Sequence, residues 1–156
     1  MRLSSILSAA AAVGVLASAA PALAQDPPNP LTKVKALRCR FPVAVSGTWK
    51  NGEVAATPRT QELLINVTEI DIGDGTAEVA GTAGKAFVSA VLSGWSLYFV
   101  DNGVGQLNVT TVFAQENSPG KLKAVHSRHG YLQMQVGKFI SEPSVSQNYG
   151  ECEILP

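Results

Sequence analysis

Residues 86–103 read AFVSAVLSGWSLYFVDNG, and this stretch decides the predicted fold. Alternate residues across Ala86–Leu92 are apolar, as in a strand whose successive side chains point to opposite faces of a sheet. Ser93-Gly94 ends this run, and a second run, Trp95–Val100, stops at Asp101-Asn102-Gly103. Because glycine and Asn-Gly pairs suit tight hairpin turns, the stretch predicts two antiparallel strands joined by a short connection.

The same pattern continues through most of the chain. Residues 62–71 are rich in β-branched side chains and precede Gly73-Asp74-Gly75, which is a hairpin signal. A first strand begins near Leu37, and further runs of the same kind lie at 76–82, 106–115, 121–129, 131–136 and 149–154. These runs predict an all-β domain, an antiparallel meander of about eight strands.

A closed up-and-down barrel is favoured over a sandwich for this meander, because closure leaves no exposed sheet edge. The alternative for an exported β-chain is an outer-membrane barrel, which shows aromatic girdles and strands of about ten residues. Only 6% of this chain is aromatic, and several runs are shorter, so the sequence argues against that alternative.

The N-terminus has the pattern of a secretion signal. Arg2 precedes an alanine-rich apolar stretch, residues 3–20, and Ala22-Leu23-Ala24 matches the small-residue motif of signal-peptide cleavage sites. We expect a signal peptide over 1–24, cleavage near Ala24, and export to the periplasm or the extracellular space with no transmembrane span in the mature chain. The proline-rich residues 25–36 are expected to form an extended, poorly packed lead-in.

The chain has two cysteines, Cys39 and Cys152, near the two ends of the predicted β domain, residues 37–156. Export favours oxidation, and no C-x-x-C spacing indicates a redox site. We therefore predict a structural disulfide that ties the first strand to the last; two buried free thiols are the alternative. In a closed barrel those two strands are neighbours.

The charge balance of the chain argues against nucleic acid or an anionic membrane as the main partner. The chain carries 12 basic and 12 acidic side chains, which gives no electrostatic reason to expect nucleic acid or an anionic membrane. Arg38 and Arg40 alternate with Leu37, Cys39 and Phe41. If Phe41 faces inward, both arginines lie on a solvated outer face.

The candidate binding site lies around the two histidines, His126 and His129. Lys121 and Lys123 must face solvent, so continued alternation places His126 and Arg128 on the inner side of their strand. On the preceding strand, Leu107, Val109 and Phe113 were the expected inner residues, and Thr111 shares their parity. We predict a ligand-binding site of Arg128, His126, Thr111 and Tyr131.

A buried arginine needs an acidic partner or water, and its guanidinium fork matches a carboxylate. A small apolar or carboxylate-bearing molecule in the barrel would meet that need. The alternative is structural: Arg128 extends to solvent at the rim, and His126 bonds a backbone carbonyl.

A metal site is disfavoured, because residues three apart on a strand point to opposite faces and His126 and His129 cannot share one ion. No cofactor and no catalytic residue is predicted. Three functions remain open: a non-catalytic binding protein, a structural or protein-interaction module of the cell envelope without a cavity, and an enzyme that uses a histidine as acid or base.

Overall fold

The computed structural model describes residues 28–81, 84–135 and 139–156, so the expected signal peptide over 1–24 lies outside the described residues. A short 3-10 helix, η1 (Pro30–Lys33), precedes eight strands. The strands are β1 (Leu37–Lys50), β2 (Glu53–Asp71), β3 (Thr76–Gly81), β4 (Gly84–Ser93), β5 (Ser96–Gly103), β6 (Gln106–Ser118), β7 (Lys121–Gln135) and β8 (Phe139–Ile154).

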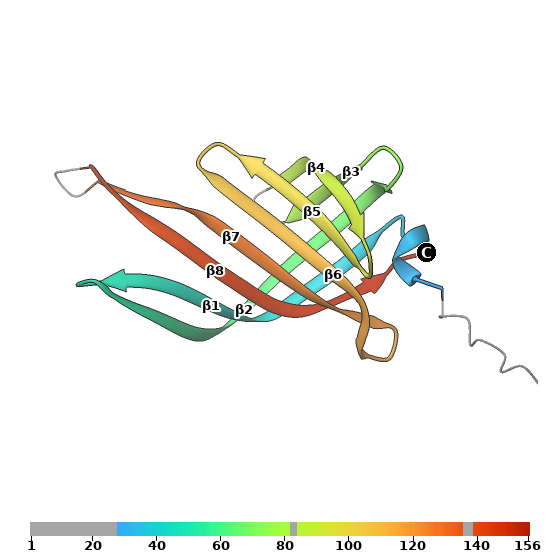
Figure 1. Cartoon of the computed structure of the whole chain (residues 1–156), viewed down its shortest axis with the longest axis horizontal. Coiled ribbons are helices and arrows are strands. Elements are labelled where there is room, and N and C mark those ends of the chain that lie inside the picture. The colour runs from blue at the N-terminus through green and yellow to red at the C-terminus, as the bar shows by residue number, and fades with distance from the viewer. Residues whose placement is uncertain (1–27, 82–83, 136–138) are drawn as a thin grey trace, which may run out of the picture.

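Each strand pairs antiparallel with the next along the chain, and β8 pairs with β1 to close a barrel. The predicted all-β antiparallel meander is confirmed. Figure 1 shows that the barrel is uneven in length, because the β1–β2 and β7–β8 hairpins extend beyond the shorter β3–β6 strands on the left of the view.

Several strands are longer than the sequence indicated. β1 continues past Pro42 to Lys50, because Pro42 lies within a register shift between Phe41 and Val43, where its missing N–H costs no ladder bond. The runs 121–129 and 131–136 belong to the single strand β7 as far as Gln135. The turn expected at 101–103 lies at Val104-Gly105, where Gly105 has a φ of 74°.

One end of the barrel, which we call the closed end, holds the apolar core. Leu37, Phe41 and Leu97 are fully buried there. η1 lies against this end in Figure 1, with Leu31 at 0% and Val34 at 2% exposure. The expectation of a poorly packed lead-in over 25–36 is therefore wrong for these residues, because their apolar side chains cover the end of the core.

The disulfide Cys39–Cys152 is present at the closed end, as predicted. The two cysteines lie directly opposite one another in the β1–β8 register, and both are fully buried. Gly150 is required nearby, because a Cβ at this position would overlap the carbonyl of Arg40 on β1. The bond and the close approach together hold the first and last strands in register.

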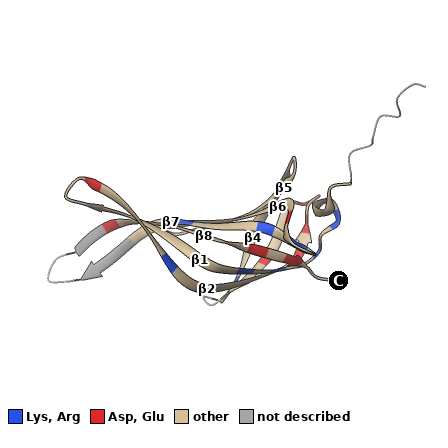
Figure 2. Ribbon diagram, turned by 90° about the horizontal axis from the view of Figure 1, so that it is seen from below, with Lys and Arg blue, Asp and Glu red and all other residues tan. Residues whose placement is uncertain are grey.

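The outer face of the closed end is charged. Arg38 pairs with Glu153 at 3.2 Å, Arg40 pairs with Glu62 at 2.9 Å, and the two arginines are solvent-exposed as predicted. Figure 2 shows basic and acidic residues interspersed on this part of the barrel rather than separated into stripes of one sign. Paired surface charges of this kind contribute little to stability.

Candidate functional site

A pocket of about 510 Å³ occupies the other end of the barrel, which we call the open end. One wall is mainly apolar and comes from β2 to β5. Its apolar residues are Leu63, Ile65, Val79, Ala86, Val88 and Phe99, and Arg59, Gln61 and Lys85 line the same side. The opposite wall is polar and comes from β5 to β8. Its residues are Asp101, Gln106, Asn108, Thr110, His126, Arg128, Ser146 and Asn148.

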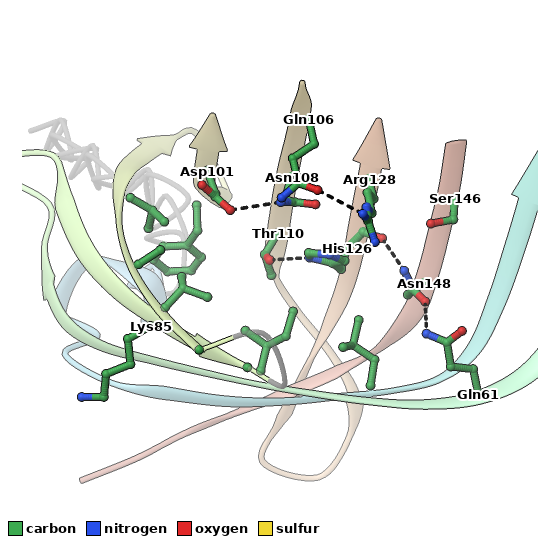
Figure 3. Close-up of a pocket in the computed structure, with 18 of the residues that line it drawn as sticks. Gln61, Lys85, Asp101, Gln106, Asn108, Thr110, His126, Arg128, Ser146 and Asn148 are labelled. Carbon is green, nitrogen blue, oxygen red and sulfur yellow. Dashed lines mark hydrogen bonds between the residues drawn. The ribbon is translucent and has the colours of Figure 1, made fainter. Parts of the chain in front are cut away.

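The polar wall contains three separate groups of hydrogen bonds, drawn as dashed lines in Figure 3. Asn108 Nδ2 donates to Asp101 Oδ2 at 3.0 Å, which links β6 to β5. Arg128 Nη2 donates to Gln106 Oε1 at 3.0 Å, which links β7 to β6. The amide of Gln106 thus orients the guanidinium of Arg128. A guanidinium has five N–H groups, and this bond uses one of them.

His126 is the deepest ionisable group of the wall. Its Nδ1 lies 2.9 Å from the hydroxyl of Thr110, and its ring centroid lies 6.0 Å from that of Phe41 in the core. Burial, and then the nearby positive charge of Arg128, lower the pKa of His126, while Asp101 acts in the opposite direction. The neutral form of the imidazole is therefore favoured at pH 7, and its tautomer sets whether Nδ1 accepts from or donates to the Thr110 hydroxyl.

Asn148 joins the two walls. Only 4% of Asn148 is exposed; its Nδ2 donates to the carbonyl of His126, and its Oδ1 accepts from Gln61 Nε2, each at 3.2 Å. This amide therefore links β8 to β7 and to β2. Within the described residues, every buried side-chain nitrogen and oxygen has a hydrogen-bond partner. These hydrogen bonds hold the buried side chains of the wall in place without a ligand.

The sequence placed two of its four candidate residues in this pocket. His126 and Arg128 line it, on the inner face as predicted, although Arg128 is solvent-exposed, as the structural alternative expected. Thr111 does not: Thr110 and Val112 are buried on the inner face of β6, and Thr111 lies on the outer face. Tyr131 is 63% exposed and also lies outside the pocket.

The error on β6 has a physical cause. Leu107 and Phe113 are apolar and were assigned to the inner face, yet they are 37% and 36% exposed on the outside. The inner face at the open end is polar because it lines the pocket. A usable signal was present in Asn108 and Asn148, since asparagine is depleted from strands unless its amide has a specific partner.

The two histidines lie on opposite faces of β7, as their spacing required. His126 lines the pocket, whereas His129 is exposed and lines a shallow outer groove with Leu107 and Tyr131. Across the part of the chain that the structure describes, no group of three or more metal-ligating side chains lies together. The described residues also contain no helix that is long and apolar enough to cross a membrane.

Comparisons of the chain with protein-family models, with curated proteins and with solved structures found no match. The chemistry of the pocket is therefore the basis on which a function can be assigned.

Proposed function

We propose that this chain is an exported, non-catalytic binding protein that holds a small amphipathic carboxylate in the pocket of its barrel. The observation that carries the proposal is the division of the pocket into an apolar wall and a preformed polar wall that contains Arg128. The volume of about 510 Å³ lies in the range of small-molecule sites.

The charge of the pocket supports an acidic ligand. Arg59 and Arg128 line it, whereas the carboxylate that lines it, Asp101, already accepts a hydrogen bond from Asn108. Lys85, at the edge, is ion-paired with Glu78 at 2.7 Å. The two arginines are left to face a ligand, and a guanidinium fork binds a carboxylate in a bidentate manner.

The same contacts support recognition rather than catalysis. The Thr110 hydroxyl is hydrogen-bonded to His126, but no carboxylate of the described residues forms a hydrogen bond with His126, so the pair lacks the third group that orients a catalytic base. The disulfide supports export, because such bonds persist in oxidising compartments. A cavity of this size also weighs against a purely structural module, whose interior would be filled.

Native mass spectrometry of the mature protein from its own export compartment tests the proposal, with spectra taken before and after denaturation. We expect a bound acid that is lost on denaturation. Ala86→Trp fills the pocket from its apolar wall and should remove this ligand, whereas Phe87→Trp, next to it on the exposed outer face, should retain it.

The double variant Arg59→Ala/Arg128→Ala should weaken rebinding of the recovered acid by about tenfold or more, because both arginines that face the ligand are lost. Arg40→Ala, on the outer face, is the matched control. An empty wild-type protein that also binds no member of a panel of apolar carboxylates would contradict the proposed function.

A further inference from the structure

Beside the pocket, one edge of β2 has no partner strand among the described residues. β2 pairs with β1 from Glu53 to Val67, but its pairing with β3 covers only Asn66 to Asp71. Gly81 lies against the carbonyl of Leu64, and no described residue pairs with the second edge of β2 over residues 53–62. Figure 1 shows β2 continuing past β3 in this region. Because main-chain groups alternate in direction along a strand, half of the N–H and C=O groups here point away from β1.

The pocket lies along this unpaired edge. Arg59, Gln61 and Leu63 of β2 line it, and Gly81 and Gly84 line it from the facing β3–β4 hairpin. At about 3.3 Å per residue, the four steps from Arg59 to Leu63 span about 13 Å. That length matches an extended segment of about five residues.

The walls suit a peptide better than a hydrocarbon chain. Four side-chain amides, those of Gln61, Gln106, Asn108 and Asn148, line the pocket, and each has more donor and acceptor sites than its recorded hydrogen bonds use. A hydrocarbon tail would desolvate these sites without replacing their water. A peptide supplies donors and acceptors in equal number, and its alternate side chains can contact the apolar wall.

Arg59 supplies a positive charge on the same strand, which complements a carboxylate on the ligand. It is exposed, lines the pocket, and forms no ion pair with any described residue. Arg59 is on β2 itself, the strand that would receive an added strand, whereas Arg128 is three strands away around the barrel on β7. A C-terminal carboxylate at the end of an added strand is therefore expected to bind Arg59 rather than Arg128.

We infer that the ligand is an extended peptide of about five residues with a free C-terminal carboxylate, which adds as a strand to the edge of β2. Its main chain pairs with β2, alternate side chains enter the pocket, and its carboxylate binds Arg59. This inference rests on the proposed function and names the class of its ligand.

The test uses the mature chain and a pool of acetylated pentapeptides. These have threonine at positions two and four and alanine, valine, leucine or phenylalanine at the other three. The same pool is prepared as C-terminal amides and with alternate amide nitrogens methylated. Octanoate, decanoate and dodecanoate are tested in parallel, and binding is measured by native mass spectrometry and titration calorimetry.

We expect the free-acid pool to bind at least tenfold more tightly than either the amidated or the methylated pool. Arg59→Ala should reduce this binding more than Arg128→Ala does, and Arg40→Ala should leave it unchanged. Equal binding of the methylated pool would overturn the pairing with β2, and an Arg59→Ala effect no larger than that of Arg40→Ala would overturn the role of Arg59.

Binding of the fatty acids without binding of any peptide would overturn the inference and leave the proposed function intact. If neither class binds and the exported protein carries no ligand, both fail.

Discussion

The closed and open ends of the barrel are built from the same strands with opposite polarity. On β8, Cys152 faces inward and Glu151 and Glu153 face outward at the closed end, whereas Asn148 faces inward and Tyr149 outward at the open end. Side chains alternate between the two faces along this whole segment. The inner face is apolar at the closed end and polar at the open end. The closed end therefore has the burial that stabilises the fold, and the open end has polar groups arranged for binding.

The largest expected effect is loss of the disulfide at the closed end. Cys39→Ser and Cys152→Ser should each lower the free energy of unfolding by about 4–5 kcal/mol in the chain-entropy model, because the bond joins residues 113 apart in sequence. Thermal and urea unfolding, with and without reductant, measure this loss. A fall in only one variant would show that the bond is not the cause.

The next effect tests whether the apolar core is confined to the closed end. Leu97→Ala should cost about 2–5 kcal/mol, because Leu97 is fully buried and its removal leaves a cavity. Leu107→Ala, on the outer face of the open end, should cost well under half as much. Urea unfolding compares the two, and equal losses would refute the division into two ends.

A smaller effect tests the inner face of β6. Thr110→Val should cost about 1–3 kcal/mol, since it leaves the buried Nδ1 of His126 without its partner. Thr111→Val, one residue along on the outer face, should change stability by less than about 0.5 kcal/mol. If the Thr111 variant were the more destabilised, the assignment of faces on β6 would be reversed.

The open end should also respond to mild acid. The pKa of His126 is lowered from its ordinary value near 6.5, so the unfolded chain binds this proton more readily than the folded one. Stability should therefore be unaffected by this group above pH 6.5 and should fall as the pH decreases below that value. Unfolding curves between pH 8 and 5 should show a slope that His126→Gln removes and His129→Gln retains.

The smallest expected effect on stability comes from Glu151, on the outer face of the closed end. A hydrogen bond from Asn117, and then one from Lys121, lower the pKa of Glu151 from 4.5 to about 2. The ionised carboxylate thus favours the folded state above pH 4.5, and this contribution is lost as the pH falls from 4.5 towards 2. Glu151→Gln should flatten acid unfolding in that window, and an unchanged acid profile would contradict this assignment.

Prediction from sequence was more successful at the closed end than at the open one. At the closed end, Lys121 and Lys123 marked the outside of β7, so Leu122 and the residues that follow it in alternation were placed correctly. At the open end of β6, the inner residues Gln106, Asn108 and Thr110 are polar and the outer Leu107 is apolar, whereas the sequence pattern predicts that the apolar face is the inner one. Because polar residues line the pocket, the rule that apolar residues face inward fails on this strand. The structure places Thr110 in the pocket, where the sequence pattern predicts Thr111.

The sequence by itself determined the strands, most of the turns, the disulfide and the inward direction of His126 and Arg128. These depend on the two-residue period of a strand and on local turn chemistry, which are properties of neighbouring residues. Only the tertiary structure decided which face of β6 lines the cavity, that Asn148 meets Gln61, and that β2 extends beyond its pairing with β3. Those features depend on what lies across the barrel, and no local pattern records which distant strand comes near.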